Sequence, residues 1–160
     1  MTLKTGDTLP DVSFMTMTAD GPAPISTDDV FAGKRVALFA VPGAYTPTCS
    51  AKHLPGFVEK ADALKAKGID AIACTSVNDV FVMGAWAKDQ NAGDALTVLA
   101  DGNGDFAKAI GLTMDASGFG MGERSQRYAM VVNDKTVEHL FVDEAGGFEV
   151  SSADHVLANL

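Results

Sequence analysis

The chain has 160 residues, 47% of them hydrophobic, and a formal net charge of −9. This size and composition predict one well-buried core, so we expect a single domain over residues 1–160. The acidic balance argues against nonspecific binding to nucleic acid or to an anionic membrane. The first residues lack a signal-peptide pattern and no apolar run approaches the roughly 18 residues of a membrane helix, so we expect a cytoplasmic protein.

The first strong pattern along the chain is a strand, helix, strand unit. The compact apolar run 36–41 is typical of a buried strand, and apolar residues then recur at helical spacing over 51–64. Gly68 follows as an expected C-cap, and a second strand is predicted over 69–74. Pro55 interrupts the helix, because proline removes a backbone hydrogen bond and clashes with the preceding turn. We therefore expect a kink or a loosened first turn there.

Shorter elements are predicted before and after this unit. In chain order they are an edge strand over 12–17, a helix over 80–91 capped by Asn78 or Asp79, a strand over 97–100, a helix over 106–110, an antiparallel hairpin of 127–132 with 137–142, and a closing helix capped by Ser151 or Ser152. The pattern as a whole predicts an α/β fold with a mixed central sheet flanked by helices.

Cys49 lies between the first strand and the following helix, after a turn that contains Pro42, Gly43 and Pro47. The N–H groups and the dipole of a helix N-terminus favour thiolate over thiol, and active sites of open α/β sheets lie at the carboxyl ends of strands. Thr46 places a hydroxyl three residues before the sulfur. The alternative is a small buried core residue, as most free cysteines are, but such a residue requires none of these neighbours.

Other candidate sites are weaker. The stretch that begins at Asp101 starts like a calcium loop, but Phe106 stands where glycine is needed and Leu112 where glutamate is needed, so we expect a polar turn. The glycine-rich stretch 118–122 follows no strand and precedes no helix, which favours a mobile loop near the site entrance.

The three histidines, at positions 53, 139 and 155, lack metal-ligand spacing. His53 follows Cys49 by four residues on the same helix, so it either lies near the site or is a partly exposed helix residue. No metal site is predicted.

Two long motifs point to a known family. These are Pro42-Gly43-Ala44-Tyr45-Thr46-Pro47-Thr48-Cys49-Ser50 and His53-Leu54-Pro55-Gly56-Phe57. Together they resemble the active-site region of the type II peroxiredoxins. The likeness continues through 76–82, Trp86, 99–101 and 127–132, nearly the full length of the chain.

The resemblance implies a thioredoxin-like fold and a thiol peroxidase that reduces hydrogen peroxide or alkyl hydroperoxides with no metal or organic cofactor. It implies that the Cys49 thiolate attacks the peroxide, that Thr46 and Arg127 stabilise the reaction, and that Pro42 shields the sulfenic acid. Arg124 is the competitor for the role of Arg127, which is preferred because it directly precedes the matching strand. Members of the family commonly pair, so a homodimer is expected.

The reductant depends on the second cysteine. Some type II members carry one near the C-terminus, but the corresponding stretch here, 147–151, has none. Cys74 lies in an expected buried strand, so the leading prediction is a one-cysteine cycle resolved by glutathione and glutaredoxin. The alternatives are a thioredoxin-reduced cycle with Cys74 as resolving cysteine, and a redox-sensing dimer without turnover. A thiol–disulfide oxidoreductase ranks lower, since Lys52 stands where the second cysteine of a Cys-x-x-Cys motif would be.

Overall fold

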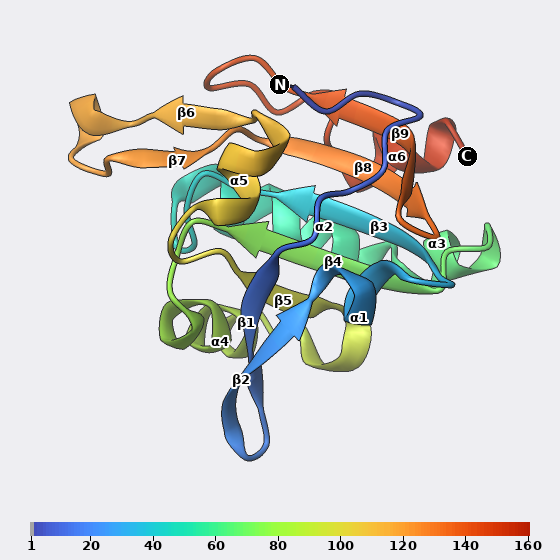
Figure 1. Ribbon diagram of the computed structural model, residues 1–160, viewed down its shortest axis with the longest axis horizontal. Helices are drawn as coiled ribbons and strands as arrows, with labels where there is room; N and C mark the ends of the chain where they lie inside the picture. The colour runs from blue at the N-terminus through green and yellow to red at the C-terminus, as the bar shows by residue number, and fades with distance from the viewer. Residues whose placement is uncertain (1) are drawn as a thin grey trace.

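The core of the molecule is one mixed sheet (Figure 1). The computed structural model describes residues 2–160, and the sheet has seven strands in the order β2-β1-β5-β4-β3-β8-β9. The strands β3, β4 and β5 run parallel, and the other pairings are antiparallel. Their bounds are β1 Ser13–Thr18, β2 Gly21–Ser26, β3 Arg35–Ala40, β4 Ala71–Ser76, β5 Thr97–Ala100, β8 Tyr128–Asn133 and β9 Thr136–Val142. A separate two-stranded sheet pairs β6 (Thr113–Asp115) with β7 (Glu123–Ser125).

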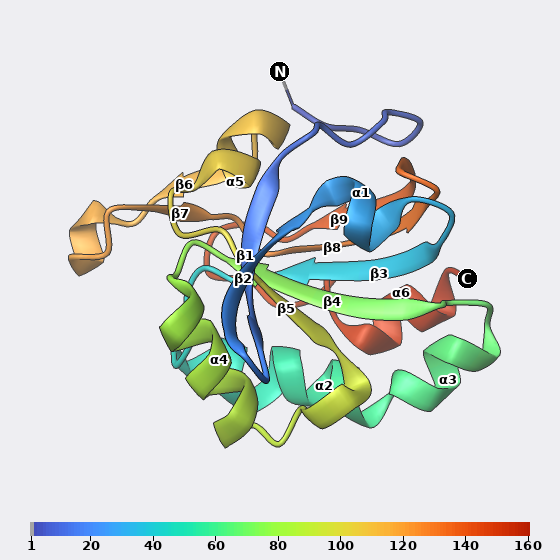
Figure 2. The same cartoon turned by 60° about the horizontal axis from the view of Figure 1, so that its bottom comes forward.

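Helices cover both faces of the large sheet (Figure 2). On one face lie α2 (Leu54–Glu59), α3 (Ala61–Ala66), α4 (Val80–Asp89) and α6 (Ala153–Ala158), and on the other lie α1 (Thr27–Phe31) and α5 (Asp105–Ile110). A π-helix, η1 (Cys49–His53), precedes α2, and two short 3-10 turns are η2 (Gly93–Ala95) and η3 (Ser117–Phe119). The predicted thioredoxin-like α/β fold with a mixed sheet flanked by helices is confirmed. Within residues 2–160, no helix combines the length and the apolar character needed to span a bilayer.

The central strand β3 explains why the sheet is buried on both faces. Alternate side chains of a strand point to opposite faces, so Leu38 packs with one core and Phe39 with the other. Both are fully buried, as expected for a parallel strand with helices above and below. The Phe39 side of the sheet is the side that carries Cys49.

The N-terminal prediction is wrong in one respect. The strand β1 is not the edge strand, because β2 pairs outside it in a hairpin joined across Thr18 and Gly21. The sequence pattern does not reveal β2, since Pro22 and Pro24 weaken a strand signal. Proline lacks an N–H donor and is tolerated at the open side of an edge strand, which is where β2 lies.

Candidate active site

Cys49 lies just beyond the carboxyl end of β3. The Val41 N–H still donates to the Thr75 carbonyl oxygen of β4, after which the chain leaves the sheet and becomes helical at Pro47. Proline is favoured at the first helical position, where its missing N–H would have no partner. The Thr46 carbonyl oxygen accepts from the Ser50 N–H at 3.0 Å, so Cys49 lies in the first turn. Its side chain is fully buried.

The turn that carries Cys49 is wider than an α-helix. Over Cys49–His53 the backbone is a π-helix, in which the Leu54 N–H donates to the Cys49 carbonyl oxygen five residues back. Pro55 follows within the first turn of α2 and supplies no N–H to the preceding turn. The predicted loosening before Pro55 is therefore confirmed, and π-turns of this kind often occur at functional sites.

Arg127 is the charged group at the sulfur, and its Nη2 lies 3.0 Å from Cys49 Sγ. It directly precedes β8, whose first residue, Tyr128, pairs with Ala40 at the end of β3. Because β3 and β8 are antiparallel, the start of one meets the end of the other. Arg124 lies elsewhere: its Nε donates to the Met121 carbonyl oxygen and its Nη1 to that of Val77.

Thr46 and Pro42 lie on the loop that leads to Cys49. The Thr46 hydroxyl donates at 2.7 Å to the Gly43 carbonyl oxygen, so its oxygen keeps its capacity to accept a hydrogen bond. Gly43 is buried, and a Cβ there would lie 3.0 Å from Met121 Cε and 3.1 Å from Thr46 Cγ2. Pro42 is half-buried at the start of the loop. A side chain at position 43 would therefore require the end of Met121 or the Thr46 methyl group to shift.

Helix α4 holds this loop from outside. The indole N–H of Trp86 donates to the Ser50 hydroxyl at 2.9 Å, and the Tyr45 hydroxyl donates to Asp89 at 2.7 Å. The Asn78 side chain accepts from the Ala44 N–H. These bonds fasten both the loop and the first turn that carries Cys49, which is a condition for precise placement of the sulfur.

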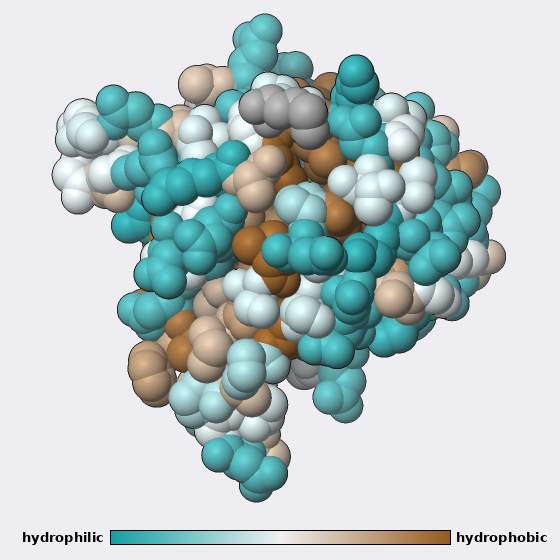
Figure 3. Space-filling model, in the orientation of Figure 1, coloured by the Kyte–Doolittle hydropathy of each residue, from teal (hydrophilic) through white to brown (hydrophobic). Residues whose placement is uncertain are grey.

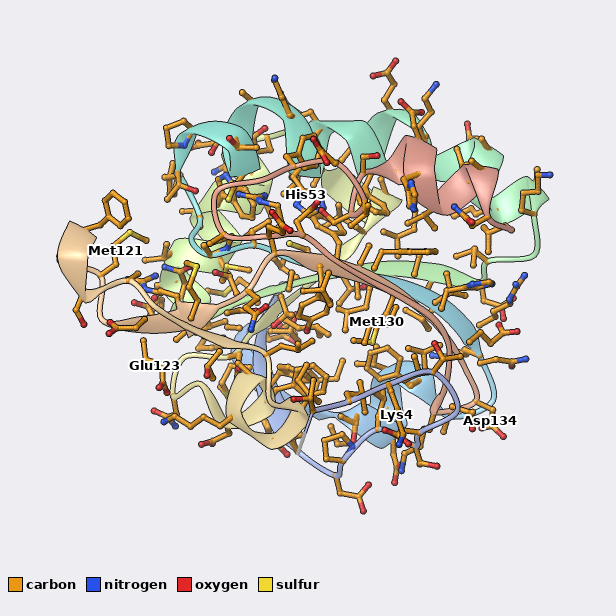
Figure 4. The ribbon with its side chains drawn as sticks, turned by 90° about the horizontal axis from the view of Figure 1, so that it is seen from above. Lys4, His53, Met121, Glu123, Met130 and Asp134 are labelled. Atoms are coloured by element: carbon orange, nitrogen blue, oxygen red, sulfur yellow. The ribbon has the colours of Figure 1, made fainter. Side chains whose placement is uncertain are left out.

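His53 is the residue that the sequence left undecided, and its interpretation as a partly exposed helix residue is wrong. The side chain is fully buried, with Nδ1 2.9 Å from Arg127 Nη1 and Nε2 2.9 Å from the Ser151 carbonyl oxygen. Figure 4 shows it between the helical segment that carries it and the C-terminal loop. Burial, reinforced by the Arg127 charge, lowers the pKa of His53 to about 3. The ring is thus neutral.

The loop between β9 and α6 covers the other side of Arg127. Asp143 accepts hydrogen bonds from the N–H groups of 149, 150 and 151 and from the Ser151 hydroxyl. Burial alone raises the pKa of Asp143, but these hydrogen bonds outweigh it and hold the pKa below its ordinary value. Phe148 lies 5.8 Å from Arg127 Cζ and 5.0 Å from the His53 ring. The sequence singled out none of these loop residues except Ser151, as one of two expected helix caps.

Cys74 lies in the middle of β4, in register with Phe39 and Val98. Both cysteines are free thiols, and the Cys74 side chain is fully buried. Burial raises the pKa of the Cys74 thiol well above its ordinary value, and the nearby Cys49 adds to the shift. A raised pKa favours the protonated thiol over the reactive thiolate.

The remaining sequence candidates have structural roles. Asp101 accepts from the N–H groups of Phe106 and Ala107 at 3.0 Å, so the predicted polar turn before α5 is confirmed. The stretch 118–122 forms the tip of the β6–β7 hairpin, and Met121 approaches Gly43 of the active-site loop. Among the described residues, no group of three or more histidine, cysteine or acidic side chains could hold a metal ion.

Comparisons with known proteins agree on the family. The model of the family described as Redoxin matches residues 4–157. The chloroplastic peroxiredoxin-2E-2 of Oryza sativa subsp. japonica is 49% identical over 164 residues, covering 99% of this chain and 73% of the relative. Reduced Prx3 of Vibrio vulnificus, solved in complex with hydrogen peroxide, is 51% identical with a TM-score of 0.94 and 98% coverage of each chain. A Burkholderia cenocepacia structure, provisionally described as a thioredoxin reductase, is 49% identical with a TM-score of 0.98, covering 100% of this chain and 99% of that one.

The fold and the buried cysteine beside a guanidinium define a thiol-dependent redox protein with the thioredoxin-like architecture. The chain belongs to the redoxin family, and its curated relatives place it among the type II peroxiredoxins. It is accordingly a thiol-dependent peroxidase, an antioxidant oxidoreductase whose substrates are a peroxide and a thiol reductant.

Proposed function

We propose that Cys49 is the peroxidatic cysteine of a one-cysteine peroxidase that reduces hydrogen peroxide and small alkyl hydroperoxides. The observation that carries this proposal is the 3.0 Å contact between Arg127 Nη2 and Cys49 Sγ. A cation that donates directly to sulfur favours the thiolate, which is the nucleophile. Within residues 2–160, no side-chain donor forms a hydrogen bond to Cys74.

The first step is a displacement at oxygen. The Cys49 thiolate attacks one oxygen of the O–O bond, an S–O bond forms, and the other oxygen leaves as alkoxide or hydroxide and takes up a proton. The net change is thiol plus hydroperoxide to sulfenic acid plus alcohol or water. Arg127, which donates to the sulfur, stabilises the charge as it moves, and the Thr46 oxygen can accept from the hydroperoxide O–H. Pro42 shields the product.

The second step requires an external thiol. We assign it to glutathione, followed by a glutaredoxin that clears the adduct: sulfenic acid and two thiols give back the Cys49 thiol, a disulfide and water. The buried, protonated state of Cys74 in β4 supports this assignment over a thioredoxin-reduced cycle with Cys74 as resolving cysteine. A thioredoxin reductase activity, as the Burkholderia relative's description suggests for that protein, is not proposed, because the substrate complex of the Vibrio relative favours peroxide reduction.

Pairing of two copies is part of the proposal. Large apolar side chains are exposed near the active-site loop: Tyr45 on the loop, Phe81 at the start of α4, and Phe119 on the β6–β7 hairpin. Figure 3 shows apolar surface over α4 and the neighbouring β1 within a mostly hydrophilic face. Such patches favour association, and we propose a homodimer through this side of the molecule.

The two free thiols favour a reducing, cytoplasmic location.

The experiment that tests the function is steady-state peroxide consumption with excess glutathione and glutaredoxin, with thioredoxin and its reductase in parallel. We expect sustained turnover with the first system, and its abolition in Cys49→Ser. A single stoichiometric oxidation with either reductant would identify a redox sensor instead. Full activity in Cys49→Ser would overturn the assignment of the cysteine.

A further inference from the structure

We infer that His53 is a positioning residue for Arg127: its neutral ring, held against the Ser151 carbonyl oxygen, fixes the guanidinium at the Cys49 sulfur. This inference rests on the proposed function of Cys49. It assigns a role to the residue that contacts the other terminal nitrogen of Arg127, and to the loop that supports that residue.

The tautomer of His53 follows from what each partner can do. Arginine has only N–H donors, so at 2.9 Å from Arg127 Nη1 the His53 Nδ1 must be the acceptor. The proton therefore lies on Nε2, which donates to the Ser151 carbonyl oxygen at 2.9 Å. A doubly protonated ring would direct a second donor and a like charge at Arg127, so only the neutral ring fits.

Asp143 holds both ends of this chain of hydrogen bonds. Its carboxylate accepts from the Ser151 N–H and hydroxyl, which fixes the carbonyl group that faces His53. Its own N–H donates to the Arg127 carbonyl oxygen at 2.9 Å. The same residue thus anchors the backbone of Arg127 and, through Ser151 and His53, the tip of its side chain.

The His53 ring is fully buried and packs against aromatic side chains. The centroids of Phe39, Phe57 and Phe148 lie 4.8, 5.7 and 5.0 Å from that of His53. An arginine side chain has several rotatable bonds, and a misplacement of about 1 Å at a reacting centre can cost about 100-fold in rate. A buried acceptor with one allowed orientation removes that freedom.

The test is a double-mutant cycle on the rate at which one equivalent of hydrogen peroxide oxidises Cys49. We expect His53→Leu, which replaces the ring with an apolar side chain of similar bulk, to slow this rate by about 10- to 100-fold. In an Arg127→Met background, His53→Leu should lower the rate of Cys49 oxidation by less than about threefold, because His53 acts on this rate by holding the guanidinium. The half-buried His139 of β9 provides the matched control, and His139→Leu should leave the rate within about twofold.

Two further measurements separate positioning from loss of packing. His53→Asn keeps an acceptor near Nδ1 and should recover part of the rate that His53→Leu loses. In the unmodified protein, nitrogen NMR of labelled histidine should show His53 as the Nε2–H tautomer at pH 5, a result that needs no variant to fold. A protonated or Nδ1–H ring, or equal losses from His53→Leu in both backgrounds, would overturn the inference.

Failure of the inference is distinguishable from failure of the proposed function. Wild-type oxidation rates in His53→Leu, with Cys49→Ser inactive, would reject only the positioning role. Unchanged peroxide consumption in Cys49→Ser would reject the function itself, whatever His53 does.

Discussion

The two cysteines occupy neighbouring parts of one core but opposite chemical environments. Both side chains are fully buried, and both pack in the cluster on the Phe39 side of β3. Cys49 begins a π-helix and receives a guanidinium N–H at 3.0 Å, whereas Cys74 lies within a parallel strand and has a raised pKa. Burial by itself therefore does not decide whether a thiol reacts. The groups that surround the thiol decide its reactivity.

Arg127→Lys is the largest change expected from a substitution that leaves both sulfurs in place. Lysine keeps the positive charge but lacks the planar fork with which Arg127 reaches Cys49 and His53 together. We expect the rate of Cys49 oxidation to fall about 100-fold or more, measured by rapid mixing with peroxide.

Arg124→Lys is its control, since Arg124 binds two carbonyl oxygens of the outer loops instead. If Arg124→Lys greatly slows Cys49 oxidation while Arg127→Lys leaves the rate unchanged, the wrong arginine has been assigned.

Thr46→Val should have a smaller but still severe effect. The change removes a hydroxyl at nearly constant volume, so the bond to the Gly43 carbonyl oxygen and the acceptor toward the substrate are both lost. We expect the oxidation rate to fall by about 10- to 100-fold, with a thermal midpoint close to that of the parent. Wild-type kinetics in this variant would remove Thr46 from the mechanism.

Acid should destabilise the Cys49 side of the molecule through His53. The ring has a folded pKa of about 3 against an ordinary 6.5, so the unfolded chain binds the extra proton between these values. The free energy of unfolding should then fall as the pH drops below 6.5, by at most about 1.4 kcal/mol per pH unit. Urea titrations at pH 7, 6 and 5 measure the slope.

Asp143 affects the free energy of unfolding in a lower pH range than His53 does. Its depressed pKa contributes stability above the ordinary value of 3.8 that is lost as the pH falls below it. His53→Leu should therefore flatten the stability profile between pH 6.5 and 4.5, on the neutral side of the Asp143 window. An unaltered slope in that variant would assign the acid sensitivity to other groups.

The sequence predicts the site better where the signal is local. The prolines and glycine before Cys49 indicate a stiff loop at a strand end, and Pro55 indicates the widened turn that follows. Arg127 required the family resemblance, because the pairing of Tyr128 with Ala40 joins residues far apart in the chain.

The partners of His53 could not be predicted in this way. Its contact with Ser151 spans 98 positions, and the bonds of Asp143 to the 149–151 backbone depend on how a loop folds back. The sequence does not reveal the hairpin of β6 and β7 for a related reason, since three-residue strands around a glycine-rich tip carry almost no periodicity.

Cys74→Ser should have the smallest effect on catalysis. With glutathione and glutaredoxin as reductants, turnover should stay within about twofold of the parent, while the buried hydroxyl costs about 1–3 kcal/mol of stability if it finds no partner. Loss of turnover with retained folding would assign Cys74 a redox role.

The measurement that tests the difference between the two cysteines most directly is site-resolved mass spectrometry after exposure to one equivalent of hydrogen peroxide, with a sulfenic-acid trap present. We expect Cys49 to carry the trap, or a glutathione adduct when that thiol is supplied, and Cys74 to remain a free thiol. A Cys49–Cys74 disulfide as the main product, or modification of Cys74 ahead of Cys49, would contradict this expectation.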